Sequence, residues 1–194
     1  MNYKTIDEIY AANGVVREKF SHVVGSLSDE LAGSLPDGEK WSIAQIVEHV
    51  SLVNDGTMRI CSRLLTKARD AGASSSGEIS ISENFLKRGS EIEQMKVTAP
   101  DRVAPTNGRT IAESLAKMEE TTRQLEELRP LFETHHSPEF TFSHPFFGDI
   151  CAQEWLVLSG AHEARHLKQI QRILEGLETK QKDPGYEEGE ITEA

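Results

Sequence analysis

The sequence predicts an all-α fold, a four-helix bundle in a single domain, and three observations lead to this prediction. Four long segments carry apolar residues at the three- and four-residue spacing of an amphipathic helix. Three of these segments begin with a capping box, in which a Ser or Thr precedes a Glu or Gln by three residues. Strand patterns are weak throughout, and 194 residues suffice for one domain with a substantial core.

The first two helices are predicted over roughly residues 6–33 and 43–69. Capping boxes mark their N-termini, and these are Thr5 with Glu8 and Ser42 with Gln45. Each helix has an apolar stripe, made of Ile6, Ile9, Phe20, Val23, Val24, Leu27 and Leu31 in the first and of Ile46, Val50, Val53, Ile60 and Leu64 in the second. Pro36 lies just beyond the expected end of the first helix, and proline disrupts a helix interior.

The third helix is predicted to begin at the capping box of Thr110 and Glu113. Pro130 should end or kink this helix near Arg129, because a proline inside a helix removes a backbone hydrogen bond. The fourth helix is predicted over roughly residues 150–178, with the residue before it, Asp149, as N-cap.

The segments between and after these helices are predicted to be less regular. A short helix is expected over residues 83–96, inside a Gly-, Ser- and Pro-containing break at residues 70–108. Residues 135–148 are expected to form an apolar loop packed over one end of the bundle. Residues 1–178 therefore form one domain, and the acidic tail at residues 179–194 is predicted to be disordered.

Composition restricts the classes of partner. Lysine and arginine number 21 and aspartate and glutamate 32, so the net charge is 21 − 32 = −11, which argues against nucleic acid or an anionic membrane as partner. Cys61 and Cys151 form no C-x-x-C motif, which fits a reducing cytosol, and both are expected to be small core residues. The polar N-terminus does not resemble a signal peptide. We therefore expect a cytoplasmic protein with a small-molecule substrate. Whether the chain forms a homodimer stays open.

Three histidines fall on helix faces that are otherwise apolar. His162 and His166 are four residues apart on the fourth helix, and at 100° per residue both lie in the middle of its apolar stripe. His49 lies on the apolar face of the second helix, where Gly56 leaves open space. Side chains at this spacing can bind one ion together with a third ligand from a facing helix. The pattern predicts a metal site formed by His49, His162 and His166.

Three neutral imidazoles suit zinc, nickel or iron, and a site with three protein ligands keeps one coordination position open, as catalytic sites do. A water or a low-molecular-weight thiol in that position would lose its proton more easily. Gln169 lies on the same stripe, and three roles for it are open. It either orients a histidine, contacts the substrate, or is a residue at the edge of the core that bonds to the backbone.

Residues 162–166 also spell H-E-x-x-H, the metalloprotease signature in which the glutamate is the general base. This alternative lacks a downstream third ligand and a strand pattern before the helix. Glu163 lies about 100° from His162, at the edge of the stripe, where it either assists the site as a second-shell or substrate-contacting residue or is simply solvated. The loop residue His144 and the nearby Phe146 and Phe147 either line a pocket mouth or pack over the bundle end.

The sequence resembles the DinB/YfiT-like superfamily at several motifs in order. These are WSIAQIVEH at residues 41–49, HPFFGD at 144–149, QEW at 153–155 and H-x-x-x-H-L-x-Q-I at 162–170. The resemblance covers roughly residues 5–178. It implies a four-helix bundle of up-down-down-up topology and a divalent metal held by His49, His162 and His166.

The resemblance also implies two kinds of activity, namely thiol-dependent S-transfer or isomerisation with bacillithiol or mycothiol, and metal-dependent hydrolysis. Family resemblance does not fix a substrate. Two hypotheses therefore stand beside the metalloprotease. One is a metal-dependent transferase or hydrolase, and the other is a non-catalytic metal-binding module, such as a stress protein or a sensor.

Overall fold

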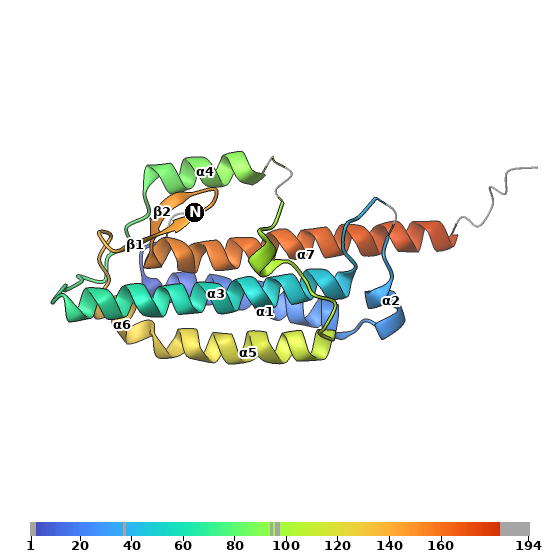
Figure 1. Cartoon of the computed structure of the whole chain (residues 1–194), viewed down its shortest axis with the longest axis horizontal. Helices are drawn as coiled ribbons and strands as arrows, with labels where there is room; N and C mark the ends of the chain where they lie inside the picture. The colour runs from blue at the N-terminus through green and yellow to red at the C-terminus, as the bar shows by residue number, and fades with distance from the viewer. Residues whose placement is uncertain (1–2, 37, 94, 96–97, 183–194) are drawn as a thin grey trace, which may run out of the picture.

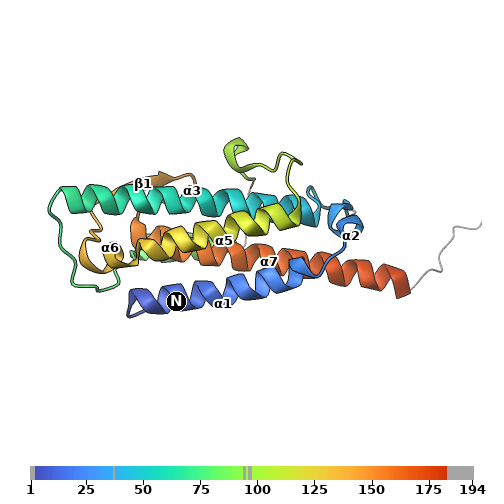
Figure 2. The ribbon, with the colours of Figure 1, turned by 90° about the horizontal axis from the view of Figure 1, so that it is seen from below.

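The computed structural model describes residues 3–36, 38–93, 95 and 98–182. It confirms an all-α four-helix bundle, in which the long helices α1, α3, α5 and α7 lie side by side (Figures 1 and 2). The elements in chain order are α1 (Ile6–Gly25), α2 (Asp29–Gly33), α3 (Ile43–Asp70), α4 (Glu83–Glu93), the 3-10 helix η1 (Asp101–Val103), α5 (Ile111–Glu127), α6 (Arg129–Thr134), β1 (Thr141–His144), β2 (Gly148–Cys151) and α7 (Ala152–Lys182).

The capping residues start α1, α3 and α5 at the predicted positions. Ser42 and Thr110 both form complete capping boxes with the residue three positions later. At α1 only half of the box forms, because the Glu8 side chain accepts a hydrogen bond from the backbone of Lys4 instead of Thr5. These caps satisfy N–H groups that would otherwise lack an intrahelical acceptor.

Hydrogen bonds between the helices give their relative directions. The Asn13 amide of α1 donates to the Leu156 carbonyl of α7, and Arg17, one turn later in α1, donates to Glu163, later in α7, so these helices run the same way. The Cys61 thiol of α3 donates to the Ala152 carbonyl at the start of α7, whereas Asn54, earlier in α3, donates to Glu163, later in α7, so α3 runs the opposite way. In Figures 1 and 2, α5 lies beside α3 and runs in the same direction as α3.

Two apolar clusters fill the bundle, and a polar layer lies between them. The cluster near α6 and the strands includes Ile9, Leu65, Phe132, Ile150 and Leu156, and the cluster near α2 includes Phe20, Ile46, Val50, Met118 and Ile170. The polar layer contains Arg17, Asn54, Ser159 and Glu163, which bond to one another across α1, α3 and α7. His49, His162 and His166 lie beside this layer.

The predicted first helix is divided in the structure. α1 ends at Gly25, and a new short helix, α2, begins after Ser28, whose hydroxyl accepts a hydrogen bond from the Leu31 backbone. Serine competes with the helix for backbone hydrogen bonds, and its presence here favours a new N-cap over continuation. The predicted break at Pro130 is confirmed, because α5 ends at Glu127 and Pro130 lies in the first turn of α6.

The apolar loop predicted at residues 135–148 is partly wrong, because its second half enters an antiparallel hairpin of β1 and β2. The turn depends on His144, whose Nδ1 accepts hydrogen bonds from the backbones of Phe146 and Phe147. Gly148 follows with φ of 72°, a conformation that favours glycine. Consequently α7 begins at Ala152, two residues later than expected.

The segment around residues 83–96 contains the expected short helix, α4, which the structure ends at Glu93. At the other end, α7 continues to Lys182, four residues past the expected domain boundary at residue 178. The remaining residues of the predicted tail, 183–194, lie outside the described residues.

Gly160 marks a close crossing of α1 and α7, and Gly160→Ala is expected to lower the free energy of unfolding by about 1–3 kcal/mol. An added Cβ would lie 1.9 Å from Oδ1 of the buried Asn13, so the Asn13 side chain or the helices must shift. Chemical denaturation measures the loss. Asn13→Ala in the same chain removes the clashing atoms and should restore part of it, whereas an undiminished loss in the double variant would contradict this account.

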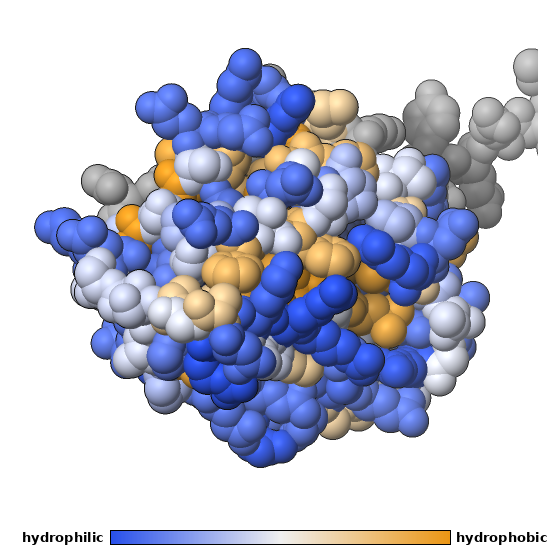
Figure 3. All heavy atoms as spheres, turned by 60° about the vertical axis from the view of Figure 1, so that its left-hand side comes forward, coloured by the Kyte–Doolittle hydropathy of each residue, from blue (hydrophilic) through white to orange (hydrophobic). Residues whose placement is uncertain are grey.

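None of the helices in the described part of the chain has both the length and the apolar character to cross a lipid bilayer. The molecular face in Figure 3 is mostly hydrophilic, with small apolar patches between polar side chains. This surface fits the net charge of −11.

Candidate metal centre

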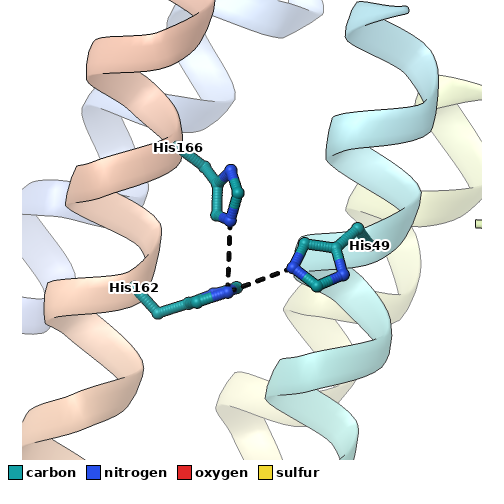
Figure 4. A group of neighbouring side chains, drawn as sticks. All are labelled: His49, His162 and His166. Atoms are coloured by element: carbon teal, nitrogen blue, oxygen red, sulfur yellow. Dashed lines mark hydrogen bonds between the residues drawn. The ribbon is translucent and has the colours of Figure 1, made fainter. Parts of the chain in front are cut away.

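The three predicted histidines meet at one point between α3 and α7 (Figure 4). Nε2 of His162 lies 3.2 Å from Nε2 of His49 and 3.2 Å from Nε2 of His166. The three ligand atoms all lie within 4.8 Å of one another. His49 is buried, and His162 and His166 are partly buried. We call His49, His162 and His166 the histidine cluster.

The outer ring nitrogens fix the protonation of two imidazoles. Nδ1 of His49 lies 2.7 Å from the Val103 carbonyl, and Nδ1 of His166 lies 2.9 Å from Oε1 of Gln169. Both oxygens can only accept, so each Nδ1 carries the proton, and in the neutral ring Nε2 presents a lone pair. Two lone pairs therefore point into the centre of the histidine cluster.

Burial keeps these rings neutral. Burial lowers the pKa of His49, and burial together with the neighbouring His49 lowers the pKa of His166 to about 4. The pKa of His162 lies well below its ordinary value because of burial, the other two histidines and, to a smaller degree, Arg165 and His144. Neutral imidazole is the form that binds transition metals.

The residues present fit a transition-metal ion. Two nitrogens that are each about 2.0–2.1 Å from a tetrahedral zinc ion lie about 3.3 Å apart. Both Nε2 separations involving His162 are close to this value. Without an ion, three convergent imidazoles cannot all be satisfied by hydrogen bonds to one another, because the Nε2 atoms of His49 and His166 both present lone pairs and the Nε2 of His162 can donate to one of them at most.

Gln169 contacts His166, one of the arrangements that its position on the stripe predicts. Its Oε1 accepts from His166, and its Nε2 donates to Glu39 at 3.1 Å. The Glu39 carboxylate also accepts from Arg172 at 2.6 Å. This chain of contacts holds the Gln169 amide with its oxygen towards His166, and thereby holds the proton on Nδ1 of His166.

Gln169→Leu should weaken metal binding by about 10–100-fold, because His166 loses the acceptor that fixes its orientation and tautomer. Competition with a chelator, followed by metal analysis, measures the change. Gln171→Leu is the matched control, since Gln171 is exposed on the same helix. Equal affinities in the two variants would show that Gln169 does not orient His166.

Glu163 is buried, so the interpretation of this residue as solvated is wrong. Its Oε1 accepts hydrogen bonds from Arg17 of α1 at 2.6 Å and from Asn54 of α3 at 2.7 Å. Its side chain is 0% exposed, and burial raises its pKa despite the neighbouring Arg17. These partners belong to the polar layer, and no hydrogen bond joins Glu163 to the histidine cluster among the described residues.

This arrangement does not resemble an H-E-x-x-H protease site. Such a site needs the glutamate free to act on the water that the metal binds, whereas Glu163 is paired with Arg17. The third imidazole, His49, comes from a separate helix more than a hundred residues earlier. Within the described part of the chain, the sheet consists of the two short strands of the hairpin, β1 and β2.

Two contributors to the site were not among the candidate site residues that the sequence predicted. The Val103 carbonyl is a backbone group, and Trp41 packs against His49 with ring centroids 4.9 Å apart. Glu48 holds the segment after η1 in place, because its carboxylate accepts hydrogen bonds from Thr106 and Asn107. Glu48 directly precedes His49 in the sequence, and this position was the available signal for its role in holding residues 106–107. In the structure Glu48 is buried.

Both cysteines and the histidines of residues 135–144 lie outside the histidine cluster. Cys61 and Cys151 are buried core residues as expected, and burial raises the pKa of the Cys151 thiol to about 12. His135 bonds to the Ala73 carbonyl through Nδ1, and the neighbouring His136 is buried. His144 lies in the hairpin and packs against Trp155, with ring centroids 5.2 Å apart.

Comparisons with known proteins agree with this architecture. The family model described as "DinB superfamily" matches residues 14–170. The chain is 25% identical over 154 residues to the uncharacterized protein YuaE of Bacillus subtilis (strain 168), a match covering 78% of this chain and 88% of that protein. The crystal structure of TT2238, a four-helix bundle protein, covers 86% of this chain and 98% of its own, with a TM-score of 0.55 and 23% identity. The structural match concerns the fold alone.

Proposed function

Since the chain belongs to the DinB superfamily, we propose that it binds one divalent transition-metal ion through His49, His162 and His166 and uses it in catalysis. The observation that carries the proposal is the convergence of three Nε2 atoms while two outer nitrogens donate to Val103 and Gln169. Zinc, nickel and iron all suit three imidazoles, and zinc is the commonest in such sites.

The proposed reaction classes are thiol-dependent S-transfer and hydrolysis. A metal held by three imidazoles supplies Lewis-acid chemistry, which makes a coordinated water or thiol more acidic. The protein's own contribution is to keep the three rings neutral and oriented, through burial, the Val103 carbonyl and Gln169. The proposed cofactors are therefore one metal ion and, for S-transfer, a low-molecular-weight thiol.

One observation favours a second candidate, a non-catalytic metal-binding module. The two best-defined surface depressions in the described part of the chain do not border the histidine cluster. One lies along the outer face of α3 between Met58 and Asp70, and the other, of about 40 Å³, is bounded by Tyr10 and Arg17. A metal site without a well-defined depression beside it would suit a protein that binds metal without turnover.

Cobalt substitution separates these functions. We expect metal analysis of native protein to give close to one divalent transition-metal ion per chain, and a simple thiol to change the visible spectrum of the cobalt form. Consumption of that thiol with an electrophile indicates the transferase, and ester cleavage without thiol indicates the hydrolase. A spectral change without turnover favours the binding module, and absence of metal from native and reconstituted protein contradicts all three.

A further inference from the structure

The antiparallel packing of α3 and α7 places Gly56 and Trp155 at one level. His49 faces His162, Gly56 lies seven residues after His49, and Trp155 lies seven residues before His162. At 1.5 Å per residue this level is about 10 Å from the histidine cluster, towards the hairpin. A Cβ added at Gly56 would meet no atom within 4 Å, so open space lies beside α3 here.

One buried N–H donor without an acceptor lies at this level, and the partly buried His144 ring lies beside it. Nε1 of Trp155 is buried, with the whole residue 4% exposed, and has no hydrogen-bond partner among the described residues. The His144 ring packs edge-to-face against Trp155, and its Nδ1 accepts from Phe146 and Phe147, so in the neutral ring its proton is on Nε2. A buried donor without an acceptor is unfavourable, which indicates that an acceptor is supplied from outside.

A positive charge acts on the His144 ring. Arg102 belongs to η1 and directly precedes Val103, whose carbonyl bonds to His49. The Arg102 charge is close enough to His144 to lower the pKa of that ring, together with burial. Arg102 is exposed and forms no ion pair within residues 3–36, 38–93, 95 and 98–182, so its charge is available to a ligand. The exposed Arg102 guanidinium therefore lies near the partly buried His144 ring, and that ring contacts Trp155, whose N–H group lacks an acceptor among the described residues.

We propose that the substrate carries a carboxylate, which Arg102, His144 and Trp155 bind about 10 Å from the histidine cluster. A carboxylate provides several acceptor positions and a negative charge, and so satisfies both N–H groups and the guanidinium together. The reacting end of the same molecule then reaches the metal, and this second half of the inference rests on the proposed function. The substrate class is an elongated carboxylic acid.

The first experiment tests the carboxylate site without metal. The chain has two tryptophans, so Trp41→Phe leaves Trp155 as the only indole fluorophore. Titrating metal-free Trp41→Phe protein with octanoate and with octanol compares a carboxylate with a neutral chain of equal length. We expect octanoate to bind at least about tenfold more tightly, as charge-assisted hydrogen bonds predict.

Arg102→Gln in this background should reduce the preference for octanoate to about twofold or less. Arg63→Gln is the matched control, because Arg63 is also exposed but lies on the outer face of α3. Equal binding of octanoate and octanol, or equal effects of the two arginine variants, would overturn the carboxylate site.

The second experiment tests the connection to the metal. In the cobalt-loaded protein, mercaptooctanoate should bind more tightly than mercaptooctanol, whereas mercaptopropionate is too short to reach both sites and should gain nothing from its carboxylate. Trp155→Phe keeps an aromatic side chain, removes the N–H donor and should weaken the mercaptooctanoate preference. If the protein does not load metal, the proposed function is contradicted, and the octanoate result can still be interpreted. If the cobalt form is normal but binds mercaptooctanoate and mercaptooctanol equally tightly, the inference is overturned.

Discussion

His162→Ala is expected to reduce the metal content of the purified protein to about a tenth of the wild-type value or less, because a two-histidine remnant is a poor transition-metal site. His162 is the central member of the cluster, since its Nε2 lies 3.2 Å from those of both His49 and His166. Elemental analysis after gel filtration measures the metal content, and circular dichroism establishes that the bundle is still folded.

His22→Ala provides the control for this loss, because His22 is an exposed histidine near the end of α1. It should keep the full metal content. His49→Ala should behave like His162→Ala, since the site draws on two helices. Retention of metal in His49→Ala with loss in His162→Ala would favour a site made by α7 alone, as in the H-E-x-x-H alternative.

The cluster could be predicted because helical periodicity alone fixes which side chains share a face. His162 and His166 at four-residue spacing fall on one apolar stripe, and His49 falls on another, so both stripes face the core in any bundle. The capping boxes at Ser42 and Thr110 depend on residues only three apart, and both form. Interactions that are local in sequence are thus the ones that the sequence reveals most directly.

The contacts that depend on a neighbouring helix were not predictable in this way. Glu163 lies at the edge of the stripe on its own helix, and its burial depends on Arg17 arriving from α1. The hairpin forms because the His144 side chain caps its turn, whereas strands of four residues leave a weak periodic pattern. The Val103 carbonyl that fixes His49 carries no side-chain signal at all.

Arg17→Ala is expected to lower the free energy of unfolding by about 3–5 kcal/mol, because it leaves the Glu163 carboxylate buried without its positive partner. The Glu163 side chain is fully buried, and the Arg17 side chain is 15% exposed. Chemical denaturation of the metal-free protein measures this effect apart from any stabilisation by bound metal.

Glu163→Gln separates the structural role of this residue from catalysis. The amide oxygen still accepts from Asn54 and Arg17 at the Oε1 position, so the loss of stability should be smaller than in Arg17→Ala. In Arg17→Ala/Glu163→Gln the unpaired buried charge is absent, and part of the stability lost in Arg17→Ala should return. Metal content should stay at the wild-type level, and at least about a tenth of any activity should remain, because a glutamate paired with Arg17 does not serve as general base. Abolished activity with full metal content would instead assign Glu163 a catalytic role and require the ion pair with Arg17 to open during turnover.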